Sequence, residues 1–590
     1  MHHTTPGWRR VAIALLLTGS AATAHGQAST PGKTGVPVEV VIEGIEDERL
    51  RVNVANFLSI RELASKPEAT DSRIAWEHRK AEEEIRTALQ PFGYYRPTIQ
   101  ASLERDGPGW RATYRVTPGT PVRVRTLDIQ LSGAATGDAS FHKLLKNLPI
   151  HVGETFEHEH WEKLKSGITG LITEHGYFSA QIVMSEVRVD PAAGSADVHL
   201  HVDSGRRYRF GETTFHQTIL KDEVLRRYNR IKPGDPYDAA ALIDLQGALA
   251  DADYYQSVEI EAGPDRAEGD TIPLDVRLRP RLRERWDFGL GYGTDTGPRG
   301  RIGFKERWVN DLGHKFTSDL RVSQIKTTLA AEYLIPGNDP RLEQYSIHSR
   351  ADYEDSTTVE NRLFLIGVGQ KLQAGDWQRL TALDWQIERF RYFDTPADIM
   401  LLIPSVTFSR STVDDSLRVY RGERLSLQLR GALEPILSDN TFFQVTAGVK
   451  EVWPLGKDMR LLARFDAGTT WTSDPEQLPS SVRYYAGGDT SIRGYEYQSI
   501  GPRNDRDKVI GGRHMLVGSI ELEHRVVGDW SVAAFVDAGD AFEHSPSMKL
   551  GAGIGVRWAS PIGPIRLDLA HGFDEPGDAF RIHFTLGPDL

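Results

Sequence analysis

The chain has 590 residues, with 70 lysines and arginines against 82 aspartates and glutamates, a formal net charge of −12 and no cysteine. This length exceeds that of one ordinary domain, so we expect several cores, or one large barrel beside smaller domains. The absence of cysteine excludes disulfide frameworks, thiolate zinc sites and cysteine nucleophiles. The acidic balance lacks the positive field that holds a phosphate backbone, so we expect no nucleic-acid partner.

The first residues have the layout of a secretory signal peptide. A basic segment at residues 8–10 precedes an apolar run over 11–17, and residues 22–24 offer a cleavage site of small side chains. The apolar run is far shorter than the roughly 20 residues of a spanning helix, which disfavours a membrane anchor. We therefore expect residues 1–24 to be a signal peptide. Beyond them no apolar stretch of spanning length occurs, which leaves a secreted soluble protein or a membrane β-barrel.

Three segments of the N-terminal half resemble one another, and their tyrosines Tyr94, Tyr177 and Tyr254 are 83 and 77 residues apart. Each segment ends a stretch of helical periodicity with an aromatic pair and leads into alternating strands, which predicts a β-α-α-β-β unit. Because aromatic side chains at such turns bury well, we interpret the pairs as core residues. The three α+β units are expected over residues 25–119, 120–205 and 206–280.

Two histidine pairs in these units have metal-ligand side chains. His158 and His160 flank Glu159, and His199 and His201 point to one face of a predicted strand. No third convergent ligand is visible in the sequence for either pair. We therefore interpret both pairs as solvated surfaces and predict no metal site.

Beyond residue 280 the helical periodicity fades and one strand follows another. Apolar residues alternate with polar or small ones over residues 286–293, 461–468, 549–558 and 580–586. A soluble sandwich gives similar alternation, but the secretory signal, the aromatic residues at strand ends and segments near the roughly 10 residues of a tilted spanning strand favour a membrane barrel. We predict an all-β transmembrane barrel over residues 281–590, with about 16 antiparallel strands.

Three motifs lie within the predicted barrel. The sequence GGDTSIRGY occupies residues 487–495, FVDAGD occupies 535–540 and GAGIGVRW occupies 551–558. In this order and spacing they resemble the BamA/TamA superfamily of outer-membrane assembly factors, whose N-terminal repeats are called POTRA domains. The resemblance spans essentially the whole chain after the signal peptide. Within the superfamily, the presence of three repeats before the barrel resembles the TamA family.

The resemblance implies that the loop bearing Arg493, Gly494 and Tyr495 folds back into the barrel lumen, where the arginine meets acidic side chains of the wall. Strand alternation places Asp537 and Glu521 on the lumen face, which fits such partners. A guanidinium fork suits two carboxylates. Glycine permits a sharp turn beside it, and a tyrosine can stack inside.

The resemblance also implies that the barrel closes by pairing its first strand, around residues 286–293, with its last, around 580–586. A seam with few hydrogen bonds can open sideways and offer its edge to an incoming strand. Inward glycines weaken packing near both ends, which is compatible with a gate. The seam residues are Trp286, Phe288, Leu290, Phe580, Ile582 and Phe584, and the inward glycines are Gly289, Gly291, Gly551, Gly553 and Gly555.

By this resemblance the protein, in the outer membrane with its repeats in the periplasm, helps to insert and assemble autotransporters and other β-barrel proteins. Its expected partners are a TamB-like inner-membrane-anchored protein, barrel clients and outer-membrane lipids. Two alternatives stay open: the outlet of a TamB-dependent phospholipid path, and a two-partner-type secretion pore. We expect no enzyme activity and no cofactor. A protease built from Asp537, Asp568 and His583 is disfavoured, because the motifs already account for Asp537.

Overall fold

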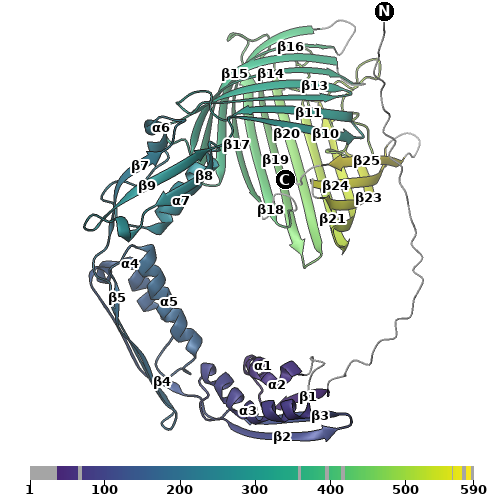
Figure 1. Cartoon of the computed structure of the whole chain (residues 1–590). Coiled ribbons are helices and arrows are strands. Elements are labelled where there is room, and N and C mark those ends of the chain that lie inside the picture. Colours follow the sequence, from purple (N-terminus) through teal and green to yellow (C-terminus); the bar gives the residue numbers. More distant parts are fainter. Residues whose placement is uncertain are drawn as a thin grey trace, which may run out of the picture. The chain divides into compact units, whose positions relative to one another are not determined.

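The computed structural model describes residues 36–63, 70–356, 360–391, 397–413, 419–560, 563–574 and 580–586. The predicted signal peptide lies outside these residues. The chain divides into two compact units (Figure 1), one within residues 1–173 and 177–207 and the other within 174–176 and 208–590.

The first unit holds two repeats with the predicted β-α-α-β-β order. The first repeat consists of β1 (Val38–Glu43), α1 (Glu48–Phe57), α2 (Ser59–Leu63), α3 (Asp71–Leu89), η1 (Gln90–Phe92), β2 (Thr98–Asp106) and β3 (Gly109–Thr117). The second consists of β4 (Arg123–Ser132), η2 (Ala134–Gly137), α4 (Ala139–Lys146), α5 (His158–Glu174), β5 (Gln181–Asp190) and β6 (Ser195–Asp203). In both sheets the last strand lies in the centre, parallel to the first strand and antiparallel to the middle one.

The first repeat departs from the prediction by a third helix, the short α2. Leu58 takes an extended backbone at the end of α1, so the helix breaks there. The Glu84 carboxylate of α3 then accepts bonds from the Ser59 backbone N–H at 3.0 Å and from its hydroxyl at 2.6 Å. A side chain that accepts these donors starts a new helix at the break.

The third repeat opens the second unit and consists of β7 (Arg209–His216), α6 (Asp222–Arg226), α7 (Ala239–Asp251), β8 (Tyr255–Glu261), η3 (Pro264–Arg266) and β9 (Thr271–Pro280). Its tyrosines Tyr254 and Tyr255 are buried, as Tyr177 is in the second repeat, whereas Tyr94, Tyr95 and Phe178 of the other predicted core pairs are only half-buried. Asp253 has a left-handed backbone, with φ 61°, where the earlier copies have glycine. Aspartate tolerates this conformation better than most residues, so the turn survives without glycine.

The remainder of the second unit is a single sheet of 16 strands in the part of the chain that the structure describes. The strands follow one another in sequence order and every neighbouring pair is antiparallel, which confirms the predicted barrel and excludes two stacked sheets. They are β10 (Glu284–Gly293), β11 (Gly297–Glu306), β12 (Lys315–Ser323), β13 (Lys326–Pro336), β14 (Glu343–Asp355), β15 (Glu360–Ala374), β16 (Trp377–Arg391), β17 (Ala397–Val413), β18 (Gly422–Ala432), β19 (Phe442–Leu455), β20 (Met459–Thr472), β21 (His514–Val527), β22 (Trp530–Phe542), β23 (Lys549–Ser560), β24 (Gly563–Gly572) and β25 (Phe580–Leu586).

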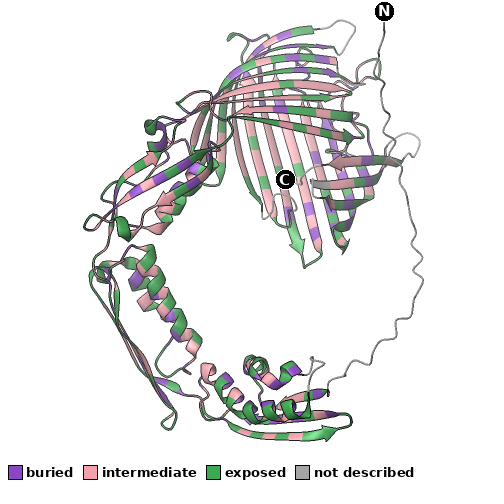
Figure 2. Cartoon of the chain, in the orientation of Figure 1, coloured by how far each residue is buried: buried purple, intermediate pink, exposed green. Residues whose placement is uncertain are grey.

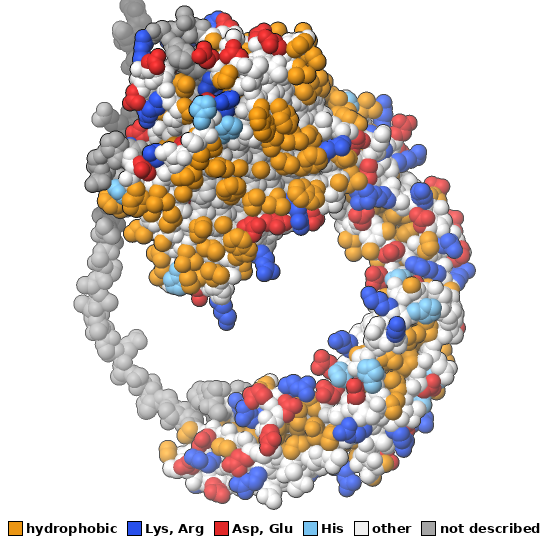
Figure 3. All heavy atoms as spheres, turned by 180° about the vertical axis from the view of Figure 1, so that it is seen from behind, with side chains coloured by type: hydrophobic (Ala, Val, Ile, Leu, Met, Phe, Trp, Pro, Cys, Tyr) orange, Lys and Arg blue, Asp and Glu red, His pale blue; other side chains and the backbone are white. Residues whose placement is uncertain are grey.

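Burial alternates along these strands, as Figure 2 shows for the barrel. In β22 the odd-numbered Ser531, Ala533, Phe535 and Asp537 are buried, whereas the residues between them are exposed. Hydrophobic side chains cover much of the barrel's outer surface in Figure 3. The outward apolar band and the inward polar residues are those of a barrel in lipid. Among the described helices, none combines the length and the apolar composition needed to cross a bilayer.

The third repeat is joined to the barrel by polar contacts. The Tyr254 hydroxyl donates to the Gly313 carbonyl at 2.5 Å, and the Asp253 carboxylate lies 2.7 Å from Lys305 Nζ. Arg341 makes a two-pronged ion pair with Asp244, with distances of 2.7 and 2.8 Å. Because these contacts come from α7 and from the turn that follows it, they fix this repeat against the first strands of the barrel sheet.

Candidate functional site

The loop between β20 and β21 carries Arg493 into the barrel lumen. Its guanidinium donates to both carboxylate oxygens of Asp537, from Nε at 2.8 Å and from Nη2 at 2.9 Å, and its backbone N–H donates to the same carboxylate at 3.0 Å. Nη1 donates to Glu521 at 2.5 Å. These are the two carboxylates that strand alternation placed on the lumen face.

The arginine belongs to a larger buried charge cluster that the motifs did not reveal. Asp568 of β24 lies 3.3 Å from Arg493 Nη1, and Arg557 of β23 donates to both Asp568 and Glu521. Glu523 lies 3.5 Å from Arg557 Nε, so two arginines face four carboxylates, all with side chains at most 10% exposed. The guanidinium also lies over the Phe535 ring, 3.4 Å from its centroid. The loop is therefore held by charged hydrogen bonds to successive strands of the wall.

Close backbone approach places the loop against the wall. Gly494 has φ 97°, and a Cβ there would lie 2.6 Å from the Gly572 backbone nitrogen. A Cβ on Gly551 would lie 2.0 Å from the Arg493 carbonyl oxygen. Tyr495 is buried, and its hydroxyl lies 3.0 Å from the Leu550 carbonyl oxygen. Gly551 therefore makes room for the loop, which adds a role to the loose packing that its residue type predicted.

The barrel seam lies between β10 and β25, the two ends of the sheet. They are neighbours in space, but in the described residues the hydrogen-bonded ladder stops at each of them. The expected pairing of first and last strands is therefore absent from this part of the chain. The backbone N–H of Phe584 instead donates to the Thr294 hydroxyl at 3.1 Å. The other seam residues, Trp286, Phe288, Leu290, Phe580 and Ile582, are exposed on the outer face.

A second part of the loop ties both sides of this seam together. The Asp489 carboxylate accepts from the Thr294 hydroxyl at 2.9 Å and lies 2.5 Å from His583 Nδ1. The Asp489 backbone N–H donates to Asp295 at 2.6 Å, and the Gly494 N–H donates to His583 Nε2 at 2.8 Å. We name Thr294, Asp295, Asp489 and His583 the seam latch. It joins the β10–β11 turn to the last strand through the loop.

Burial raises the pKa of the Asp295 carboxyl to about 6, and the nearby charge of Asp489 adds to this effect. The backbone N–H of Asp489 and the charges of His583 and Arg581 act in the opposite direction. The latch therefore holds two carboxylates close together, one of which takes up a proton readily.

The three residues of the disfavoured protease, Asp537, Asp568 and His583, are divided between two groups of contacts. Asp537 and Asp568 bind Arg493, whereas the His583 ring contacts the Asp489 carboxylate and the Gly494 backbone N–H. Asp489 belongs to the GGDTSIRGY motif, but its contact with His583 was not predicted, because the loop has no periodicity that assigns a side chain to a partner. Asp568 and Arg557 have lumen-facing parity, but only the register brings them to Arg493.

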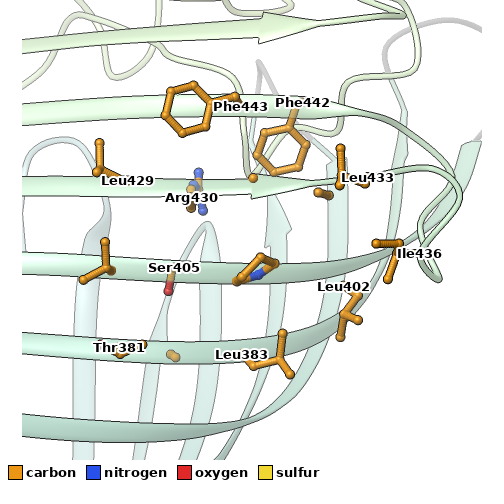
Figure 4. A pocket seen from close by; sticks show the side chains of 15 residues that line it. Thr381, Leu383, Leu402, Ser405, Leu429, Arg430, Leu433, Ile436, Phe442 and Phe443 are labelled. Atoms are coloured by element: carbon orange, nitrogen blue, oxygen red, sulfur yellow. The ribbon is translucent and has the colours of Figure 1, made fainter.

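Two hollows of the barrel differ in character. The lumenal one has a volume of about 410 Å³ and is lined by Arg464, Arg493, Asp295 and Asp568 among others. The other, of about 640 Å³, opens on the outer face and is lined mainly by apolar side chains such as Leu383, Leu429 and Phe443 (Figure 4). Since these side chains are outward residues of their strands, we assign the second hollow to the lipid-facing surface.

The second repeat contains a cluster that the sequence analysis did not detect. His199 and His201 converge on the carboxylate of Asp128, which stands on the neighbouring strand β4. The third ligand that the sequence did not show is therefore present. The other pair differs, because His158 Nε2 is bound to the Tyr95 hydroxyl at 2.7 Å.

Sequence models of known families match most of the chain. The model of the Omp85 superfamily domain matches residues 289–589, about half of the 590 residues. The model of POTRA domain TamA domain 1 matches residues 39–118. The POTRA model of the surface antigen variable number repeat matches residues 125–205 and 208–281.

Curated relatives and a solved structure resemble the chain as well. Outer membrane protein assembly factor BamA of Nitratidesulfovibrio vulgaris is 24% identical over 402 residues, which cover 62% of this chain and 49% of that protein. BamA of Neisseria meningitidis serogroup B is 22% identical over 586 residues, covering 86% of this chain and 72% of that protein. The chain thus spans about half the length of the first relative. The crystal structure of Haemophilus ducreyi BamA lacking POTRA domains 1–3 matches in fold, with a TM-score of 0.67, 19% identity and coverage of 79% of this chain and 99% of that one.

Proposed function

The chain belongs to the Omp85 superfamily, and from this premise we propose that it helps to insert and assemble β-barrel proteins in the outer membrane, autotransporters among them. The barrel lies in the outer membrane and the three repeats lie in the periplasm. The known relatives named BamA are outer membrane protein assembly factors, which supports the general role.

The seam is the observation that carries this proposal. In the described residues β10 and β25 face each other without a ladder, while every other neighbouring pair of barrel strands is joined by one. An unpaired strand edge presents a row of backbone donors and acceptors that an incoming strand can satisfy. Addition of such a strand needs no external energy source, because main-chain hydrogen bonds supply the affinity.

In this proposal the seam latch holds the seam between β10 and β25 closed when no client strand is present. Its side chains hold the β10–β11 turn and β25 near each other with few contacts, in place of a continuous ladder. A strand that enters the seam has to displace only these contacts. In this proposal the Arg493 cluster keeps the loop anchored to the wall while the latch opens.

The repeats dock a TamB-like inner-membrane-anchored protein in this proposal. The match of residues 39–118 to the first POTRA domain of TamA supports this choice within the superfamily. We further propose that the protein is no enzyme, because the lumenal carboxylates already serve the arginine cluster.

A phospholipid outlet is the second candidate function, and the apolar hollow on the outer face of the barrel suits acyl chains. A passive secretion pore is less favoured, because the loop crosses the lumen and is anchored there by Arg493. Conductance of the purified barrel in a planar bilayer separates the pore from the other functions.

A disulfide across the seam tests the proposal in this naturally cysteine-free chain. Leu290 of β10 and Leu586 of β25 line one hollow at the seam, so we place the two cysteines at these positions. We expect the oxidised pair to block assembly of a barrel client in proteoliposomes, and reduction to restore it.

The matched control is a cysteine pair at Val536 and Ala552, which are direct partners in the ladder of β22 and β23. This crosslink should leave assembly unchanged. Efficient locking of the seam with full client assembly would contradict insertion through the seam, and lost lipid transfer in the same vesicles would favour the lipid outlet.

A further inference from the structure

The sheet of the second repeat brings three metal-ligand side chains to one face. His199 and His201 stand two residues apart on β6, so their side chains share a face of the strand. Val198, Leu200 and Val202 between and beside them are buried in the core, so the histidines lie on the opposite face. Asp128 on β4 is the register partner of His199.

The three side chains converge on one point. Asp128 Oδ2 lies 2.7 Å from His201 Nε2 and 3.3 Å from His199 Nδ1, and the three ligand atoms all lie within 4.8 Å of one another. Tetrahedral zinc with bonds of about 2.0–2.1 Å separates its ligands by roughly 3.3 Å. Only small side-chain adjustments are needed to admit the ion.

The arginines near Asp128 pair with other carboxylates, so the Asp128 carboxylate faces the two imidazoles. The neighbouring carboxylates of the same sheet are paired with arginines, Asp197 with Arg125 and Glu186 with Arg188. The Gln130 amide donates to the other oxygen of Asp128 at 3.1 Å, as an outer partner that orients a metal-binding carboxylate does.

We propose that Asp128, His199 and His201 form a binding site for a zinc-class divalent metal ion on the second repeat. Two imidazoles and one carboxylate are ligands that Zn²⁺ accepts, and three protein ligands leave one position for water. The side chains are 34%, 26% and 22% exposed, which lets an ion enter from solvent.

Calorimetric titration tests this site, with Zn²⁺ alone added to the full-length protein in detergent. The visible spectrum with Co²⁺ in place of Zn²⁺ reports the geometry of the bound ion. The protein is purified without an oligohistidine tag. We expect one tightly bound ion per chain and a tetrahedral Co²⁺ spectrum. His201→Asn should weaken binding beyond the roughly 10- to 100-fold that loss of an outer partner costs, and Gln130→Ala should fall within that range.

Asp128→Asn removes the carboxylate ligand but preserves the shape of the side chain. Circular dichroism checks that this variant is folded, so that weaker zinc binding is due to loss of the ligand. His216→Asn is the matched control, since His216 pairs with Asp275 at 3.3 Å in the third repeat without a second histidine. Its zinc affinity should equal that of the wild type. Zinc binding that survives both His201→Asn and Asp128→Asn, or an octahedral Co²⁺ spectrum in the wild type, would overturn the proposal.

Discussion

Arg493 carries its charge into a place with little water, since its side chain is only 10% exposed. The carboxylates that surround it are equally buried, so each charge depends on its partner for solvation. Replacement of a whole buried ion pair by apolar groups is often neutral, whereas removal of one member leaves an uncompensated charge. The cluster therefore specifies where the loop lies more than it adds net stability.

Arg493→Ala should destabilise the folded barrel by about 3–5 kcal/mol, because Asp537, Glu521 and Asp568 lose a shared partner. The measurement is the temperature at which the barrel loses its fast mobility on an SDS gel. Arg503→Ala is the control, because Arg503 is an exposed arginine of the same loop whose ion pair with Asp507 is worth only about 0–1 kcal/mol. Equal transitions in both variants would refute the anchoring role of Arg493.

Gly551→Ala should displace the loop, since a Cβ there would meet the Arg493 carbonyl oxygen at 2.0 Å. The expected loss of stability is about 1–3 kcal/mol, as for other overpacked sites. Gly300→Ala in β11 is the control, because a Cβ there meets nothing within 4 Å. Limited proteolysis of the loop is the readout, and a loop as protected as in the wild type would contradict this expectation.

At the scale of elements, the hydrogen-bonded sheet ends at β10 and β25, and side chains of the lumenal loop connect these two strands. Sixteen strands follow one another in register, yet the two terminal strands are joined in the described residues by side chains from a turn and a loop. Side-chain contacts depend on few groups and on their charge state. A latch of this kind responds to pH, which a backbone ladder does not.

The latch should weaken as pH rises. The Asp295 pKa of about 6 lies above its ordinary value of 3.8, so the latched state binds the proton more tightly than the open state does. The charged carboxylate therefore disfavours the latch above pH 6, and this penalty disappears as pH falls towards 4. We expect a shorter distance between spin labels on the cysteines of the Leu290 and Leu586 variant at pH 5 than at pH 8.

Asp295→Asn should remove most of this pH dependence, because the amide oxygen still accepts from the Asp489 N–H without carrying charge. Asp507→Asn, at an exposed position of the same loop, should retain it. A pH profile that is the same in all three proteins would show that Asp295 does not control the latch.

At the scale of the whole molecule, the third repeat and the barrel form one compact unit. Tyr254 belongs to the aromatic pair that follows α7, and its hydroxyl donates to the Gly313 carbonyl of the barrel. The hydrogen bond therefore ties the position of this repeat to the loop between β11 and β12 of the barrel.

Tyr254→Phe should cost about 1–3 kcal/mol, because the Gly313 carbonyl loses a buried partner. Tyr345→Phe is the control, since the Tyr345 hydroxyl binds Glu343 at an exposed site. Thermal unfolding followed by intrinsic fluorescence measures the difference. A Tyr254 variant as stable as the control would mean that this hydrogen bond does not secure the junction.

The sequence by itself determined the three repeats, the barrel and the inward parity of Asp537 and Glu521. These follow from periodicity, which is local: a period of two assigns each side chain to a face wherever the strand pairs. It also placed His199 and His201 on one face of a strand.

Only the tertiary structure decided which side chains meet. Asp128 stands 71 residues from His199, and Asp489 stands 94 residues from His583. Their contacts depend on strand register and on the path of an irregular loop, and neither leaves a local pattern in the sequence. The open seam was decided in the same way, because the pairing of two strand edges depends on the curvature of the whole sheet and on the loop that occupies the lumen.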